Sequence, residues 1–459
     1  MVDRILVTFA TEDSGTDELS WGQQSIWMSM TNAESSLPIG DFATLPVPIT
    51  LAEATAVLRF VLHRHQSLRT RVVTGEDGVS RQVVRTSGIA PLEVVHAGAD
   101  DATEVARRTM ARYYAVPFDY ADEWPIRMAA VLVDGLVTHI VAVYCHIAVD
   151  VHGIDALVAD LATMDPATGE PAVGVSGLTP LQQARRQAEP AARRHSAAAV
   201  RYCAGLIRNI PARRYRESPD PRSPRWWQIR LNSPAAYLAG RAVAARNRVH
   251  TSPVLLAAFA VAISEVTRIH PAVAELVVNN RFRPGMAGAI GPISQECLGV
   301  IDVADSTFDE VVGRAWQAST RAGKHAYYDP DDMAAMIAAA GRDRGEPIDV
   351  DCYFNDRRRA HLNPPMPGRE PTEAEIAAAL RATRLSWDEP LVKYDHTLFF
   401  HVDDVPGTFE FQMTADTHKL APAEMETLMR RIEDVLVTAV LDPSTRTPSL
   451  SRKAASVEY

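Results

Sequence analysis

The sequence has 459 residues, of which 47% are hydrophobic and 23% charged, the composition of a globular protein large enough for two core-sized units. Its formal net charge of -10 argues against a nucleic-acid partner and against a polybasic membrane-binding surface, because both require a basic face. The N-terminus lacks the apolar core of a signal peptide, and no run of about 18 apolar residues predicts a membrane span. We therefore expect a cytoplasmic protein that binds neither nucleic acid nor membrane.

In the first half of the chain, helical and strand-like segments alternate. Ser20 is a candidate cap for the first helix, and an Asp134-Gly135 turn joins the last two strands into a buried hairpin. The predicted helices cover 19–32, 51–66, 102–115 and 153–164, and the predicted strands cover 68–73, 80–85, 125–133 and 136–144.

A stretch rich in Pro, Gly and Ala at 165–180 marks the first plausible boundary. We predict an N-terminal lobe over 1–175, a bridging segment over 176–225 and a C-terminal lobe over 226–459. The mixture of helices and strands in both halves indicates an α+β protein with two similar lobes. In the second half, helices are predicted over 253–269, 307–324, 372–382 and 422–441, and strands over 274–279, 299–303, 348–354, 397–402 and 409–414.

The cysteines give no sign of a metal site. The four of them are scattered, no C-x-x-C pair occurs, and no Cys/His cluster has zinc spacing. We therefore expect no bound metal and four buried thiols that pack as small hydrophobic groups. They are Cys145, Cys203, Cys297 and Cys352.

The most informative segment runs from Val141 to Asp155. An apolar run ends at His146, a carboxylate follows at Asp150, and a helical pattern then begins. A neutral imidazole at the end of a strand can accept a proton from an amine or alcohol, because its unperturbed pKa lies near ~6.5. The local sequence alone leaves open whether His146 does this or is a structural residue.

Six segments, in order, then resemble the motifs of one family, the condensation domains of nonribosomal peptide synthetases in the chloramphenicol acetyltransferase-like superfamily. Each motif alone is weak, but their order and spacing together favour the family, and the resemblance covers about 15–445. The segments are Leu19-Ser-Trp-Gly-Gln-Gln-Ser-Ile-Trp27, Arg64-His-Gln-Ser-Leu-Arg-Thr70, Cys145-His-Ile-Ala-Val-Asp-Val151, Arg281-Phe-Arg-Pro284 with Ile290-Gly-Pro292, Asp351-Cys-Tyr-Phe-Asn-Asp356 and Asp395-His-Thr-Leu-Phe-Phe400.

The resemblance implies an architecture and a reaction. Two chloramphenicol acetyltransferase-like lobes would form a V-shaped pseudo-dimer with a central tunnel, and carrier proteins would deliver substrates on phosphopantetheine arms, with no cofactor bound permanently. The partners would be an acyl or peptidyl carrier protein and a small-molecule or carrier-bound amine acceptor. Because one such unit is visible, we predict a free-standing, monomeric acyltransferase of natural-product biosynthesis that meets its partners in trans.

Residue roles follow by resemblance. His146 occupies the place of the family's second motif histidine, which positions or deprotonates the nucleophile. Asp150 would hold the loop that aims His146, with Arg281 as its ion-pair partner. Two residues depart from the family pattern, since Cys145 replaces the first histidine and Val151 replaces a glycine. The β-branched valine stiffens the turn and adds bulk beside the active histidine.

Further residues have alternative interpretations. Ser294 and Gln295 lie where the family approaches its tunnel and could contact substrate, although the segment itself favours an ordinary polar loop. Trp387 could line the cleft or pack in the core. The run Arg357-Arg358-Arg359 is either a solvated loop or a docking patch for an acidic carrier protein.

Three functions are compatible with the sequence. The first is a condensation enzyme that forms an amide from a carrier-bound acyl or aminoacyl thioester and an amine. The second is a domain whose active motif has degraded, as Cys145 and Val151 suggest, and which recruits partner enzymes to a carrier-bound substrate. The third is an ester-forming acyltransferase of the same superfamily, although the Asp-Phe-Gly-Trp-Gly motif of its plant-type branch is absent.

Overall fold

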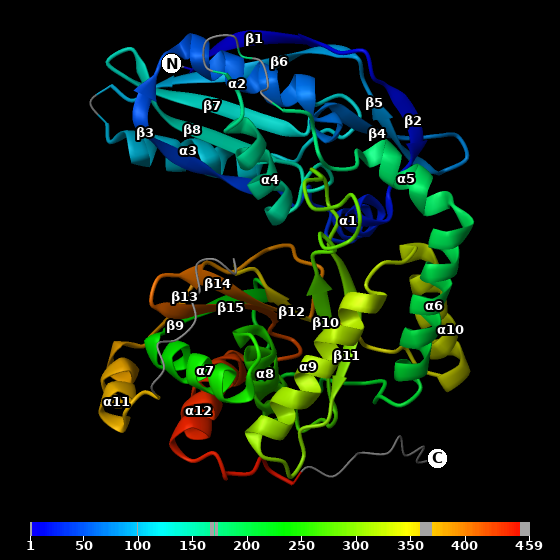
Figure 1. The fold of residues 1–459 in the computed structure, drawn as a ribbon, viewed down its shortest axis with the longest axis vertical. Coiled ribbons are helices and arrows are strands. Elements are labelled where there is room, and N and C mark those ends of the chain that lie inside the picture. Colours follow the sequence, from blue (N-terminus) through cyan, green and yellow to red (C-terminus); the bar gives the residue numbers. More distant parts are fainter. Residues whose placement is uncertain (1, 99, 166–168, 170–172, 359–369, 450–459) are drawn as a thin grey trace. The chain divides into compact units, whose positions relative to one another are not determined.

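The computed structural model describes residues 2–98, 100–165, 169, 173–358 and 370–449. The chain divides into two compact units, drawn in Figure 1: unit 1 comprises Met1–Arg194 and Asn279–Ser294, and unit 2 comprises His195–Val278 and Gln295–Tyr459. This division differs from the predicted lobes in two respects. The predicted bridging segment is shared between the units, and Asn279–Ser294 returns to unit 1. The V shape and the tunnel stay predictions.

Unit 1 is built on a five-stranded sheet in the order β1-β6-β7-β8-β3, beside a three-stranded sheet in the order β2-β5-β4. Residues of α2 and α4 share one hydrophobic core with the first sheet, and residues of α3 share the core on the opposite face. The strands are β1 (Val2–Ala10), β2 (Gly15–Glu18), β3 (Ile39–Ile49), β4 (Thr70–Thr74), β5 (Ser80–Val84), β6 (Ser87–His96), β7 (Ile126–Val133) and β8 (Leu136–Tyr144). The helices are α1 (Trp21–Asn32), α2 (Leu51–Arg64), η1 (Gln66–Arg69), α3 (Ala102–Ala115), α4 (Val151–Leu161) and α5 (Pro180–Ala188), and α6 (Pro190–Ile207) continues from unit 1 into unit 2.

The predicted helix cap and the predicted hairpin turn in unit 1 are both confirmed. Ser20 caps α1 and forms a capping box with Gln23. β7 and β8 pair antiparallel, and Asp134 and Gly135 at their turn both have positive φ, as tight hairpin turns require. This hairpin places the residues that follow β8 at one end of a buried sheet.

Unit 2 is built on a seven-stranded mixed sheet in the order β11-β10-β12-β14-β15-β9-β13. One face, which carries Leu276, Phe354, Phe400 and Phe411, is buried in a single core with α7, α8, α9 and α12. The strands are β9 (Trp226–Ser233), β10 (Ala272–Val278), β11 (Gln295–Ile301), β12 (Cys352–Asp356), β13 (Arg384–Trp387), β14 (Leu398–Val405) and β15 (Thr408–Asp416). The helices are α7 (Pro234–Asn247), α8 (Thr251–Thr267), α9 (Phe308–His325), α10 (Pro330–Arg344), α11 (Glu373–Ala382) and α12 (Pro422–Leu441).

Within the described ranges, no single helix is both long and apolar enough to cross a membrane. The consecutive helices α7 and α8 reach the required length and apolarity only when taken together, and they are bent by 113°.

Candidate active site

His146 lies on a tight turn that follows β8. The turn is closed by hydrogen bonds from Ala148 N to Cys145 O (3.0 Å) and from Val149 N to His146 O (3.3 Å). Its backbone is tied to two other segments, since Cys145 N donates to Pro125 O (3.1 Å) and His146 N to Ser36 O (3.4 Å). The imidazole is therefore presented by a backbone that is fixed on both sides.

The two ring nitrogens of His146 differ in environment. Nδ1 is buried and has no hydrogen-bond partner among the residues that the structure describes. Nε2 also has no hydrogen-bond partner in that part of the chain, but unlike Nδ1 it is not fully buried, and the residue as a whole is half-buried. Such a ring can exchange a proton with a substrate at Nε2, because no protein group occupies that atom.

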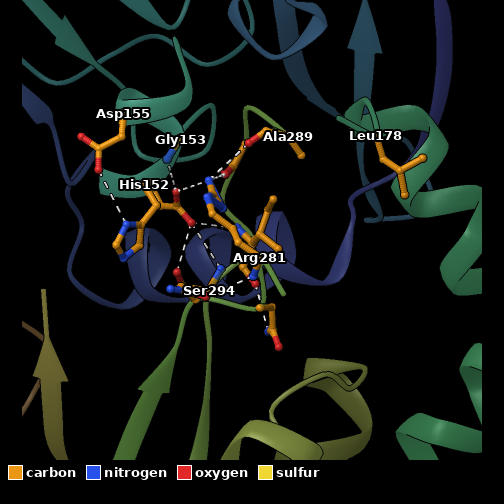
Figure 2. A network of polar contacts seen from close by, with 12 residues as sticks. His152, Gly153, Asp155, Leu178, Arg281, Ala289 and Ser294 are labelled. Carbon is orange, nitrogen blue, oxygen red and sulfur yellow. Dashed lines mark hydrogen bonds and ion pairs between the residues drawn. The ribbon is translucent and has the colours of Figure 1, made fainter. Parts of the chain in front are cut away.

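Asp150 is the N-cap of α4, and five hydrogen bonds converge on its buried carboxylate. Oδ1 accepts from Gly153 N and from Arg281 Nη2, both at 2.7 Å. Oδ2 accepts from Ile293 N (3.1 Å), Ser294 N (3.3 Å) and Ser294 Oγ (3.1 Å). Figure 2 shows these contacts converging from α4 and from the segment that ends at Ser294. The predicted ion pair between Asp150 and Arg281 is confirmed.

Arg281 fills the space beside this carboxylate. Its Nη2 also approaches the carbonyl oxygens of Ala289 (3.3 Å) and Gly291 (3.5 Å). Burial lowers the pKa of Arg281, and the negative charge of Asp150 counteracts that effect. Gly153 is required here, because a Cβ at this position would lie 2.7 Å from Val149 Cγ2 and 3.1 Å from Arg281 Nη2.

The helix that carries Asp150 at its start is also fixed near its end. Asp160 in α4 pairs with Arg64 at 2.5 Å and with His65 Nε2 at 3.0 Å. Both partners belong to the Arg64–Thr70 motif. This motif therefore contributes to holding α4, and through it the turn that bears His146.

The two departures from the family pattern are both accommodated. Cys145 is 1% exposed, burial raises the pKa of its thiol to about 12, and Sγ donates to Ser36 O at 3.7 Å. Val151 is the first residue of α4 and does not have positive φ. Its half-buried side chain therefore adds bulk without backbone strain.

The tentative substrate-binding residues have contacts within the protein. Ser294 donates to Asp150, and the side-chain amide of Gln295 donates to Tyr328 O (2.9 Å) and accepts from Tyr328 N (3.3 Å). Trp387 lies on the edge strand β13, is 37% exposed and meets Trp227 edge-on, so the interpretation as a core residue is wrong. Substrate contacts for all three stay predictions.

Among the residues that the structure describes, the basic run after β12 does not form a solvated loop. Arg357 pairs with Asp403 at 2.6 Å, and Arg358 pairs with Asp356 at 2.7 Å while its side chain is only 5% exposed. Arg359 lies outside the described residues.

Sequence reasoning missed a second polar cluster, which lies in unit 2. Parallel pairing of β12 with β14 brings two family-like motifs together, so that Asp351 Oδ1 lies 3.2 Å from His396 Nδ1. Asp395 Oδ1 lies 3.2 Å from Nε2 of the same ring. Burial opposes protonation of His396, but the hydrogen bond to Asp351 and the two carboxylate charges outweigh it and raise its pKa. The sequence signal that could have revealed this cluster is His396, which stands where the family motif Asp-Leu-Thr-Leu has its first leucine.

In the part of the chain that the structure describes, no group of three or more His, Cys, Asp or Glu side chains is arranged to hold a metal ion.

A family model described as the condensation domain matches residues 42–452. The chain belongs to the condensation-domain family. It is 27% identical over 453 residues to the nonribosomal peptide synthetase kk1B of Curvularia clavata, an alignment that covers 95% of this chain. The same alignment covers 3% of that synthetase, so this condensation domain spans a small part of its curated relative.

Solved structures share the fold at low sequence identity. The condensation domain that mediates chain release from the enacyloxin polyketide synthase is 19% identical, with a TM-score of 0.69, and the match covers 95% of this chain and 85% of that one. The X-domain from teicoplanin biosynthesis is 18% identical, also with a TM-score of 0.69, and the match covers 95% and 97% of the two chains. A teicoplanin X-domain has also been solved in complex with OxyB. These likenesses confirm the α+β, chloramphenicol acetyltransferase-like fold class.

Proposed function

We propose that this condensation domain transfers an acyl or aminoacyl group from a carrier-protein thioester to an amine. The amine nitrogen forms a bond to the thioester carbonyl carbon, the carbon–sulfur bond breaks, and the proton lost by the amine ends on the departing thiol. His146 positions the amine and moves that proton through Nε2. A phosphopantetheine arm delivers the thioester, and holding it beside the acceptor accounts for much of the rate.

One observation carries the proposal: a turn fixed on both sides presents an imidazole whose Nε2 has no protein partner in the described part of the chain. The supporting structure is complete, because Asp150, Arg281 and Gly153 form a packed hydrogen-bonded unit beneath that turn. Buried charges are costly unless paired, and here the two charges are paired with each other.

The experiment combines an acyl-loaded carrier protein with a panel of amines and hydroxyl compounds, and mass spectrometry identifies the products. We expect an amide that forms with the wild-type protein and is lost with His146→Ala. His152→Ala is the matched control, since His152 follows the same turn but faces Asp155 at 3.7 Å. Ester as the only product would contradict amide formation.

A second candidate is recruitment of partner enzymes to a carrier-bound substrate. It is favoured by the replacement of the first motif histidine by Cys145 and by the likeness to the X-domain that has been solved with OxyB. This function predicts that no acceptor is consumed and that His146→Ala leaves the pathway's output unchanged.

A further inference from the structure

Two segments hold the turn of His146 from outside, and one of them passes through Ser36. The carbonyl oxygen of Ser36 accepts hydrogen bonds from His146 N at 3.4 Å and from Cys145 Sγ at 3.7 Å. Ser36 is 2% exposed and lies in the loop between α1 and β3. It therefore contacts the backbone of His146 itself, whereas the other segment contacts the neighbouring Cys145 through Pro125.

The side chain of Ser36 contacts the chain that leads into β7. Its Oγ accepts a hydrogen bond from Phe118 N at 2.6 Å and another from the hydroxyl of Tyr120 at 3.3 Å. A serine hydroxyl has two acceptor lone pairs, so both donors can be satisfied at once. Phe118 is buried, and its amide would be costly to leave without an acceptor. The hydrogen bonds of this one serine therefore join its own loop, the turn of His146 and the chain before β7.

The loop around Ser36 has backbone strain on both sides of that residue. Glu34 and Leu37 have φ of 46° and 42°, in the left-handed region that residues other than glycine seldom adopt. Hydrogen bonds from Ser35 N to Met30 O (3.1 Å) and from Leu37 N to Ser35 Oγ (3.2 Å) hold the loop in this form. Strained backbone persists only where the surrounding structure determines it, and such positions concentrate at functional sites.

Apolar packing encloses the same hydrogen bonds. Tyr120 meets Trp27 of α1 edge-on, with ring centroids 5.1 Å apart. Both rings belong to the hydrophobic core on the α3 face of the sheet, together with Leu37, Phe118 and Cys145. Hydrogen bonds in such surroundings are electrostatically stronger than in water, and they fix a single arrangement of the groups that they join.

We propose that Ser36 is a positioning residue, which sets the place of His146 by holding its backbone against the chain before β7. This inference rests on the proposed function, in which His146 moves the proton of the attacking amine. Ser36 acts through the backbone of His146 and takes no proton itself. Acyl transfer requires closely aligned groups, and a misplacement of about 1 Å can cost roughly 100-fold in rate.

The first test measures amide formation under single-turnover conditions, from an acyl-loaded carrier protein and the panel amine that gives most product. Ser36→Ala keeps the carbonyl but removes the acceptor for Phe118 and Tyr120. It should lower the rate at saturating amine roughly tenfold, because the imidazole is displaced. The amine concentration at half the maximal rate should change less than twofold, because no amine contact is removed.

The matched control is Ser264→Ala, in α8 of unit 2. Ser264 is 1% exposed, and its hydroxyl has no hydrogen-bond partner in the described part of the chain. The control therefore removes an equally buried hydroxyl without removing a hydrogen bond, and it should leave the rate unchanged. All rates are compared per folded protein, well below the thermal midpoint of each variant.

A second readout does not require turnover. In protein with isotope-labelled histidine rings, the NMR signals of His146 are those that disappear in His146→Gln. Ser36→Ala should shift these signals and leave those of His396 in unit 2 in place. Ser264→Ala should shift neither. A role in stability alone would change the thermal midpoint without moving the His146 signals.

Tyr120→Phe decides the question if Ser36→Ala does not fold, because it removes one donor and leaves Ser36 in place. It should lower the saturating rate roughly threefold, the effect of one hydrogen bond between neutral groups. It should also shift the His146 signals.

The proposal is overturned if the His146 signals or the saturating rate stay unchanged in Ser36→Ala or, where that variant does not fold, in Tyr120→Phe. An equal loss of rate in Ser264→Ala would also overturn it. Absence of product with the wild-type protein would contradict the proposed function alone, because the His146 signals still report whether Ser36 positions the ring.

Discussion

At Asp150, one buried carboxylate accepts hydrogen bonds from three backbone nitrogens, one hydroxyl and one guanidinium. All of its acceptor capacity is used inside the protein, which leaves none for a reacting proton. Its contribution is to fix the start of α4 and the segment before Ser294 in one arrangement. Under the proposed function, the motif's side chain left to handle the reacting proton is His146.

Asp150→Asn should lower the free energy of unfolding by about 3 kcal/mol, because it leaves the Arg281 guanidinium buried without its counter-charge. Urea denaturation measures the change. Asp155→Asn is the matched control on the same helix, and it should shift stability by no more than about 0.5 kcal/mol because its side chain is 34% exposed. A loss of equal size in both variants would contradict a special structural role for Asp150.

The stability of the chain should also report on Glu275. Burial raises its pKa above 4.5 in the folded state, so the unfolded chain releases this proton at lower pH than the folded chain does. The unfolding free energy therefore falls as the pH rises from the unfolded pKa toward the folded one. Glu275→Gln should remove this penalty, and urea denaturation should show a larger gain over wild type at pH 8 than at pH 5. An equal gain at both values would show that the carboxyl is not perturbed.

At the scale of elements, α1 packs directly against the chain that precedes Ser294. A Cβ on Gly22 would collide with the carbonyl oxygen of Pro292, so this helix can approach that closely only through glycine. The family-like motif at 19–27 and the Ile290-Gly-Pro292 segment thus meet within unit 1. Their contact supports the residues that donate to Asp150.

Gly22→Ala should cost about 2 kcal/mol of unfolding free energy, because the added methyl group must displace backbone. Gly313→Ala is the control, since Gly313 lies exposed in α9 with no neighbour within 4 Å. That variant should gain about 0.5–1 kcal/mol from the higher helix propensity of alanine. Thermal unfolding compares the two, and a stable Gly22→Ala protein would contradict the close packing.

Val151→Gly tests the bulk at the start of α4. The variant should remain folded and lose about 1 kcal/mol, since glycine has lower helix propensity and buries less surface. We predict a change in the range of amines accepted, measured with the same carrier-protein panel. An unfolded variant, or an unchanged acceptor range, would count against a position beside the reacting groups.

The strongly periodic elements could be predicted from sequence. The helix over 102–115, the helix over 422–441 and the strand over 136–144 have the predicted bounds. The strand β3 escaped prediction because Pro46 and Pro48 interrupt its pattern, which an edge strand with an irregular register tolerates.

Other features depend on the packing of distant segments. α7 is rich in alanine and buried on several sides, so it has no amphipathic stripe to detect. The motif order pointed to His146, Asp150 and Arg281, but the donors from Gly153, Ile293 and Ser294 depend on the folded backbone. Glu275 and Glu296 share one face of the sheet through the register of β10 with β11, which no single segment encodes.

At the scale of the whole molecule, the family assignment covers nearly all of the chain, whereas the curated relative it matches is far longer. The donor and acceptor therefore have to be found by experiment. A net charge of -10 gives overall repulsion from an acidic carrier protein, so docking would rest on local basic groups.

We propose that His146 handles the proton of the attacking amine during acyl transfer. The decisive measurement is the single-turnover rate of amide formation from an acyl-loaded carrier protein, with His146→Gln compared against His152→Gln at equal thermal stability. We predict a loss of roughly 100-fold or more for His146→Gln, the contribution typical of a general base, and about the wild-type rate for His152→Gln. An unchanged rate with His146→Gln would contradict the account.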